Sequence, residues 1–211
     1  MRECMCNRTH HEPKLMVLTG GPGAGKTTAL EVVRRHFCEH VTVLPEAASI
    51  LFGGGFPRDR SASGRRAAQR AIFHVQRELE QQAVEEGYAG LILCDRGTVD
   101  GVAYWPGDVA EFWDEVGSTP EVELARYAAV VHLRTPTVAD GYGYANPLRI
   151  ESAAEAHELD ERTLAAWSRH PQRAVVRDHT DFMRKVSRTL ALIAEEVPSC
   201  CRVRPLSLPA P

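Results

Sequence analysis

A glycine-rich segment near the start of the chain has the residue types and the spacing of a phosphate-binding loop. In LTGGPGAGKTTAL, residues 18–30, two glycines five positions apart precede Lys26 and Thr27, which is the P-loop pattern. Glycines allow positive φ and let backbone N–H groups converge on phosphate oxygens, and a helix that begins near Lys26 adds the positive end of its dipole. The pattern predicts a nucleotide-binding set of Gly20, Gly21, Pro22, Gly23, Ala24, Gly25, Lys26, Thr27 and Thr28.

A nucleoside triphosphate with magnesium is the ligand that this loop favours. Lys26 can reach the β and γ phosphates as a mobile point charge, and the Thr27 hydroxyl can ligate Mg²⁺. The segment LILCDRG then supplies an apolar strand that ends in Asp95, beside the loop in a parallel sheet. There Asp95 can bind the metal, hold a metal-bound water, accept a proton from a substrate hydroxyl, or simply cap a turn. We predict ATP and Mg²⁺ as cofactors, with Thr27 and Asp95 as metal ligands; ATP is the default because no guanine-reading motif is visible.

A second carboxylate follows another short apolar run, VTVL at 41–44. Glu46 stands at the carboxyl end of that strand, where it can overhang the same crevice and meet the hydroxyl of a phosphate acceptor, or start a helix with no chemical role. The acceptor pocket is expected between Glu46, the glycine-rich loop at 53–58, the helix that begins near Arg65 and the segment TVDGVAYW. Candidate contacts are Gln69, Arg70, Phe73, Asp100, Tyr104 and Trp105, although core packing is the alternative for Phe73 and Trp105.

The elements that must position these residues alternate along the chain. Apolar runs predict strands at 14–19, 41–44, 89–94, 128–133 and 173–177. Amphipathic segments predict helices at 26–38, 65–86, 109–116, within 150–168, and at 180–196. This alternation is typical of an α/β fold in three layers, with a five-stranded parallel sheet and helices on both faces. With the glycine loop after its first strand, it is the arrangement of a P-loop NTPase.

Length and composition indicate one medium-sized domain. The chain has 211 residues, 44% hydrophobic and 25% charged, with a formal net charge of −3, and this balance argues against binding nucleic acid or an anionic membrane. We predict a flexible N-terminus at 1–13, the main domain at 14–197 and an irregular tail at 198–211. The start lacks the apolar stretch of a secretion signal, so a cytoplasmic location is expected.

The N-terminal segment carries four residues of the types that bind zinc. These residues are Cys4, Cys6, His10 and His11. Two cysteines one residue apart miss the usual spacing of metal-binding cysteines, so the sequence favours a flexible terminus over a metal site.

The ordered motifs resemble those of the P-loop nucleoside and nucleotide kinases, including thymidylate kinases, deoxynucleoside kinases and the nicotinamide riboside kinase domain. The likeness rests on GGPGAGKTT, the glutamate after the second strand, DRG at 95–97, HLRTP at 132–136 and LRIE at 148–151. It implies that Glu46, Asp95 and Arg96 meet the acceptor hydroxyl. It also implies a helical lid at about 135–170 whose arginine, Arg149 or else Arg162, touches the transferring phosphate.

The whole arrangement from about residue 14 to 197, including AAWSRHPQRAVV, is similar to a group of small bacterial AAA-type ATPases. The sequence departs from deoxynucleoside kinases in having Ala47 after the glutamate, where they usually carry proline, and in lacking a dense arginine cluster in the lid. These departures leave the identity of the acceptor open.

The reaction expected from these residues is phosphoryl transfer from ATP to a hydroxyl of a small metabolite such as a nucleoside, nucleotide or natural product. The catalytic set is Lys26, Glu46, Asp95, Arg96 and Arg149. The alternative is an ATPase or GTPase switch that acts with a protein partner; such a protein should show a water-positioning glutamine or glutamate after the acid, and DRGTVDG shows none. A small-molecule acceptor is the predicted partner, and the oligomeric state is left open, a homodimer included.

Overall fold

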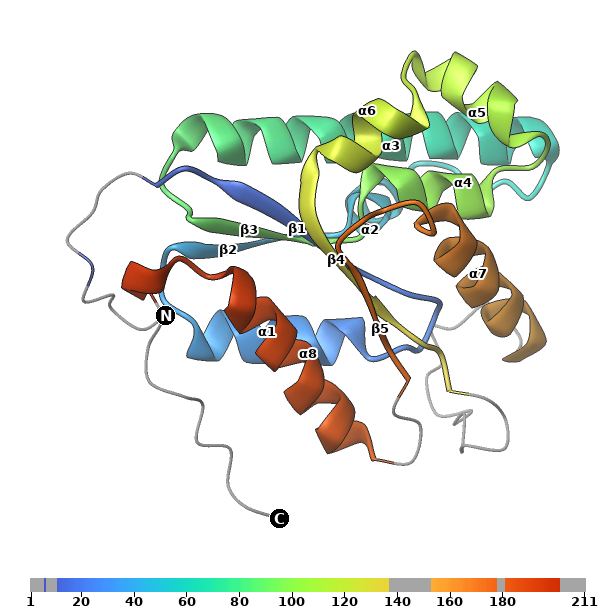
Figure 1. Cartoon of the computed structure of the whole chain (residues 1–211). Coiled ribbons are helices and arrows are strands. Elements are labelled where there is room, and N and C mark those ends of the chain that lie inside the picture. The colour runs from blue at the N-terminus through green and yellow to red at the C-terminus, as the bar shows by residue number, and fades with distance from the viewer. Residues whose placement is uncertain (1–5, 7–10, 137–152, 178–180, 202–211) are drawn as a thin grey trace.

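The computed structural model describes residue 6 and residues 11–136, 153–177 and 181–201. Within these residues five parallel strands form one sheet in the order β2-β3-β1-β4-β5 (Figure 1). The strands are β1 (Lys14–Thr19), β2 (Val41–Leu44), β3 (Leu91–Asp95), β4 (Tyr127–Leu133) and β5 (Arg173–Val176). The predicted five-stranded parallel sheet is therefore confirmed.

One face of the sheet is covered by α1 (Lys26–His36) and α8 (Phe182–Glu196), which lie side by side in Figure 1. Alternate residues of β1 point to this side, because successive side chains of a strand face opposite ways. Met16 and Leu18 pack there with Leu30 of α1 and Leu190 of α8, all of them buried. Asp181 begins α8, and its side chain accepts hydrogen bonds from two backbone N–H groups of the first turn.

The opposite face is covered by the long helix α3 and by shorter helices near its N-terminal half and its middle (Figure 1). Leu15, Val17 and Ile92 pack there with Phe73 of α3 and with Trp167. Apart from α1 and α8, the helices and turns of the described residues are α2 (Ala47–Gly53), α3 (Ala62–Glu86), η1 (Thr98–Asp100), α4 (Gly101–Tyr104), α5 (Val109–Val116), α6 (Pro120–Ala125) and α7 (Ala153–Ala166). A last turn, η3 (Ser199–Cys201), follows α8. Helices on both faces confirm the predicted three-layer fold.

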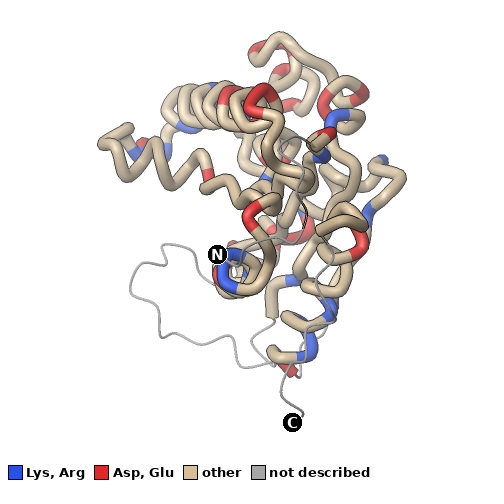
Figure 2. Tube along the Cα trace, turned by 90° about the vertical axis from the view of Figure 1, so that its left-hand side faces the viewer, with Lys and Arg blue, Asp and Glu red and all other residues tan. Residues whose placement is uncertain are grey.

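Acidic and basic residues are interspersed along most elements, in keeping with the small net charge (Figure 2). Within the described part of the chain, no helix combines the length and the apolar character that crossing a membrane requires.

Candidate active site

The loop between β1 and α1 has the backbone of a phosphate-binding loop. Gly20, Gly23 and Gly25 have φ angles of 137°, 76° and 94°, a region that residues with a side chain rarely occupy. A Cβ on Gly20 would also lie 2.0 Å from the carbonyl oxygen of Leu133 on β4. The loop can therefore take this path only with glycine at these positions, which is the physical reason for the spacing seen in the sequence.

Lys26 lies across this loop. Its Nζ donates hydrogen bonds to the carbonyl oxygens of Gly20 at 3.0 Å and Gly21 at 3.2 Å. Burial and the nearby Arg96 lower the pKa of the Lys26 ammonium to about 8, although the neighbouring carboxylates oppose the shift. An anionic ligand in the loop would raise the pKa of Lys26 again, because its charge stabilises the ammonium form.

Asp95 ends β3 beside this loop, since it pairs in register with Leu18 of β1. Its Oδ1 is buried, and no group among the described residues makes a hydrogen bond to it. Burial raises the pKa of the Asp95 carboxyl, and Glu46 adds to the shift, while Lys26 opposes it. A buried carboxylate oxygen without a partner fits a hard cation such as Mg²⁺, which takes oxygen ligands. Thr27, exposed in the first turn of α1, offers the second predicted oxygen.

Glu46 forms an ion pair with Arg96. Arg96 Nε donates to Glu46 Oε1 at 2.7 Å, and the Ser49 hydroxyl donates to Oε2 at 2.5 Å. Burial works against the charge of Glu46, but Arg96 and Ser49 outweigh it and hold the pKa of the carboxyl below its usual value. Glu46 does precede α2 as its N-cap, yet its side chain makes no capping hydrogen bond. The carboxylate therefore bridges Arg96 and the Ser49 side chain of α2, and it does not cap the backbone N–H groups of that helix.

Arg96 is held in an unusual conformation. Among the described residues it is the one non-glycine residue with positive φ, at 71°, and its backbone N–H donates to the carbonyl of Leu18 at 3.1 Å. Its guanidinium also donates to Asp100 Oδ1 at 3.1 Å and lies over the ring of Tyr104. Such strain persists only where the surroundings over-determine it, and it is commonest at functional sites.

Asp100 is 3% exposed and supports the Glu46–Arg96 ion pair through its contacts with Arg96. Its Oδ1 accepts from the Thr19 hydroxyl as well as from Arg96, and its Oδ2 accepts from the backbone N–H of Gly97 at 3.0 Å and from Trp167 Nε1 at 3.1 Å. Asp100 was expected among the pocket contacts; the structure shows that it also anchors Arg96 to the end of β1.

A cavity of about 250 Å³ opens next to the ion pair. It borders the phosphate-binding loop at Pro22 and is lined by both Glu46 and Arg96. Four of the candidate contacts lie in its wall: Gln69, Phe73, Asp100 and Tyr104. The other two candidates have different roles, since Arg70 pairs with Glu115 and Trp105 is buried in the core.

Asp160 of α7 is a site residue that the sequence analysis missed. It is fully buried, and its Oδ1 accepts a hydrogen bond from the backbone N–H of Gly21 at 2.9 Å. His132 Nε2 lies 2.9 Å from the same oxygen, and Arg134 Nε lies 2.9 Å from Oδ2. Burial would raise the pKa of this carboxyl, but His132, Gly21 and Arg134 together lower it. The glycine loop is thereby joined to α7 and to the end of β4.

A signal for Asp160 does exist in the sequence. Ala156, Thr163 and Trp167 stand four positions before, three after and seven after it, which places all four on one helix face. The structure buries that face completely. A carboxylate in the middle of a buried stripe must have partners, so the pattern itself points to a polar anchor.

The predicted lid is described only in part. The α7 portion is packed against the glycine loop through Asp160, and Arg162 on the same helix donates to the carbonyl of Trp105 at 3.1 Å. Arg162 also lines a cavity with Val102 and Trp113, which is separate from the one beside Glu46. Arg149 and the rest of 137–152 lie outside the described residues, so the lid and its arginine stay predictions.

Comparison with known proteins agrees with this fold. A family model described as AAA domain matches residues 15–185, whereas a search of curated proteins gives no match. Among solved structures, NadR protein in complex with NR has a TM-score of 0.65 at 17% identity, with 94% of this chain and 55% of NadR covered. This chain thus spans about half the length of NadR.

Two further structures are covered over most of their own length. Thymidylate kinase from Candida albicans has a TM-score of 0.62 at 14% identity, covering 87% of this chain and 92% of the kinase. Deoxyadenosine kinase from M. mycoides with bound dATP has a TM-score of 0.59 at 14% identity, covering 85% of this chain and 98% of that kinase. The predicted resemblance to the P-loop nucleoside and nucleotide kinases is confirmed at the level of the fold.

Proposed function

This chain belongs to the AAA-domain family whose model matches residues 15–185, and we propose that it is an ATP- and Mg²⁺-dependent kinase of a small hydroxyl-bearing metabolite. One observation carries the proposal. The Glu46–Arg96 ion pair lines a cavity that also borders the phosphate-binding loop at Pro22, so a carboxylate and a guanidinium would face a molecule bound there, next to phosphates in the loop. A protein that only hydrolyses ATP has no need of such a cavity.

Phosphoryl transfer depends mainly on positioning and on positive charge around the moving group. Backbone N–H groups of the loop other than that of Gly21 (Pro22 has none), together with the start of α1, would hold the phosphate chain, and Lys26 would supply charge to the transferred group. Magnesium, held by Asp95 and Thr27, would supply further neutralisation of the phosphate oxygens. Asp160 positions the loop by accepting a hydrogen bond from the backbone N–H of Gly21.

On the acceptor side, the ionised Glu46 accepts a hydrogen bond from the substrate hydroxyl. As the bond from the acceptor oxygen to phosphorus forms and the bond from phosphorus to the leaving ADP oxygen breaks, the hydroxyl proton passes to Glu46. Arg96 keeps the carboxylate in place and adds charge beside the transferring group. The low pKa of Glu46 fits a proton that moves late, once the hydroxyl has become acidic.

The nucleoside class is the acceptor class that the cavity favours. Its wall includes two amides, those of Gln69 and Gln76, and aromatic residues such as Phe73 and Tyr104, and this combination can bind a flat polar base. Gln76 Nε2 donates to the buried Glu80 at 2.7 Å, and this bond fixes the orientation of the amide. The similar folds were solved with NR, with NAD and AMP-PNP, and with dATP, which supports nucleosides and ATP as the molecules to test first.

A two-stage experiment tests the proposal. Thermal shift with Mg²⁺ and a non-hydrolysable ATP analogue should first show stabilisation, and a true acceptor should add a further shift by mass action. Each hit is then incubated with γ-labelled ATP, and the label should appear on the acceptor. If ATP is hydrolysed at the same rate with and without every acceptor, the switch or ATPase function replaces the kinase.

Nucleotide binding should depend on pH through Lys26. Its pKa of about 8 should rise when phosphates occupy the loop, so above pH 8 binding must take up a proton. Affinity for the ATP analogue should therefore be about 10-fold weaker one pH unit above this pKa than one unit below it. Titration calorimetry in buffers of different ionisation enthalpy counts the proton, and Lys26→Ala should abolish the uptake. A proton count of zero in the wild-type protein would contradict the prediction.

A further inference from the structure

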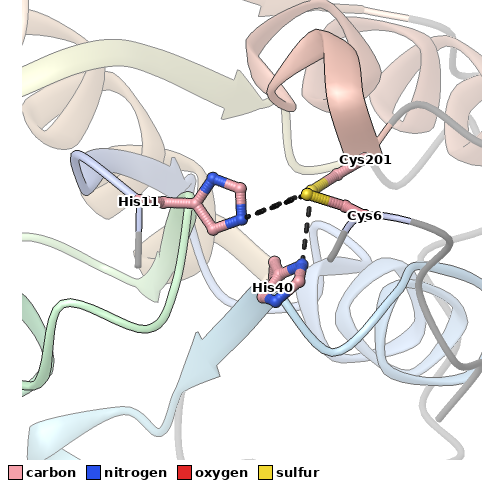
Figure 3. Close-up of side chains that lie close together, drawn as sticks. All are labelled: Cys6, His11, His40 and Cys201. Atoms are coloured by element: carbon pink, nitrogen blue, oxygen red, sulfur yellow. Dashed lines mark hydrogen bonds between the residues drawn. The ribbon is translucent and has the colours of Figure 1, made fainter. Parts of the chain in front are cut away.

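Four side chains of zinc-binding type converge at the amino ends of the strands, which is the end of the sheet opposite the phosphate-binding loop. Cys6, His11, His40 and Cys201 each offer one ligand atom, and all four atoms lie within 4.8 Å of one another. Figure 3 shows the two sulfurs side by side and the two imidazole rings directed toward them. The four residues come from three separate parts of the chain, so no spacing rule could have grouped them.

Three sulfur–nitrogen distances in this cluster match those of a tetrahedral zinc centre. Cys201 Sγ lies 3.4 Å from His40 Nδ1 and 3.7 Å from His11 Nε2, and Cys6 Sγ lies 3.9 Å from the same His11 nitrogen. Zn–S bonds of about 2.3 Å and Zn–N bonds of about 2.0–2.1 Å at a tetrahedral angle place sulfur and nitrogen about 3.6 Å apart. These three sulfur–nitrogen separations thus lie close to the one that the metal would impose.

The surrounding contacts hold the ligands in place. His40 and Cys201 are 2% and 4% exposed. The carbonyl of His40 accepts hydrogen bonds from the N–H groups of Gly90 and Leu91, and the N–H of His11 donates to the carbonyl of Gly87. The rings of His11 and Tyr88 pack against the His40 ring at 4.5 Å and 4.9 Å between centroids. These bonds fix both histidines against the loop that leads into β3.

We propose that Cys6, His11, His40 and Cys201 bind one Zn²⁺ as a structural site. Two thiolates balance the charge of the ion, and a Cys₂His₂ set with four protein ligands leaves no open position for a substrate. The zinc site would hold the N-terminal segment and the turn after α8 against the amino ends of the strands. It is independent of the proposed kinase activity, because it lies at the ends of the strands opposite those that carry Glu46 and Asp95.

This proposal revises the expectation for the N-terminal segment. Cys6 and His11 were among the four residues considered there, but their partners are His40 and Cys201. The other two, Cys4 and His10, lie outside the described residues.

Metal analysis of adjacent cysteine variants tests the site. Protein purified under reducing conditions without chelators should contain one zinc per chain by mass spectrometry. Cys201→Ser should reduce the zinc content to below about a tenth of the wild-type value. The matched control is Cys200→Ser, because Cys200 is the exposed neighbour and lies outside the four-residue set. It should keep the full zinc content.

A second measurement on the wild-type chain guards against a variant that does not fold. Chelator treatment should lower the melting temperature, and zinc should restore it. Cobalt added to the metal-free chain should give the absorption of a tetrahedral cobalt–thiolate centre. Wild-type protein that contains no zinc and takes up no cobalt would overturn the proposal. So would an intact mass showing that Cys6 and Cys201 are joined in a disulfide in the protein as isolated.

Discussion

Lys26→Ala is expected to lower phosphoryl transfer by roughly 10²- to 10³-fold, the usual cost of removing one preorganised group that stabilises developing charge. Lys26 lies across the glycine loop, bound to the carbonyls of Gly20 and Gly21, and it is the group that carries positive charge from α1 into the loop. Turnover with the acceptor found by the screen, measured together with affinity for the ATP analogue, checks the prediction. The loss should be larger in turnover than in affinity if the lysine acts mainly in the transition state.

The matched control is Lys14→Ala. Lys14 is an exposed lysine at the amino end of β1, and it forms a surface ion pair with Glu196 at 3.5 Å. Surface pairs contribute little to stability, so this variant should keep wild-type kinetics. Equal activity in Lys26→Ala and Lys14→Ala would remove the basis for the nucleotide site and for each role assigned around it.

Local patterns predicted most of the fold. The apolar runs at 14–19 and 41–44 coincide with β1 and β2, and the helix predicted at 109–116 coincides with α5. The short helices α2, α4 and α6 were missed because each has too few residues to show a period. α6 nevertheless has a start signal, since Thr119 caps it and Pro120 occupies its first turn.

The residues that local patterns could not group are those whose partners are far away in the chain. Asp160 meets Gly21 across 139 positions, and Cys201 meets His40 across 161. A glycine loop is recognisable because its function needs consecutive residues, whereas a buried carboxylate or a metal ligand needs only proximity in the fold. The family resemblance implied that Glu46 and Arg96 both meet the acceptor hydroxyl, but it gave no contact between them; the structure adds that the two side chains form an ion pair at 2.7 Å.

Glu46→Gln is expected to lower phosphoryl transfer by roughly 10²- to 10⁴-fold, the range for a lost general base, while affinity for the ATP analogue stays nearly unchanged. The amide keeps the shape of the side chain and can still accept a hydrogen bond from Arg96, but it can no longer take the acceptor proton. Because the pKa of Glu46 is held low, wild-type turnover should be flat through neutral pH and fall only in acid, as the carboxylate becomes protonated. The pH–rate profile and single-turnover transfer to the acceptor measure both effects.

Two variants separate this role from the alternatives. Asp95→Asn should raise the magnesium concentration needed for half-maximal turnover, an effect that Glu46→Gln should lack, because Asp95 has the buried oxygen without a partner. Glu111→Gln removes the same charge from a surface ion pair with Arg66, and it should change neither the rate of phosphoryl transfer nor the magnesium requirement. If Glu46→Gln transferred phosphate at the wild-type rate, the base would be Asp95, whose pKa is raised by burial, and Glu46 would serve only to hold Arg96 in its strained conformation.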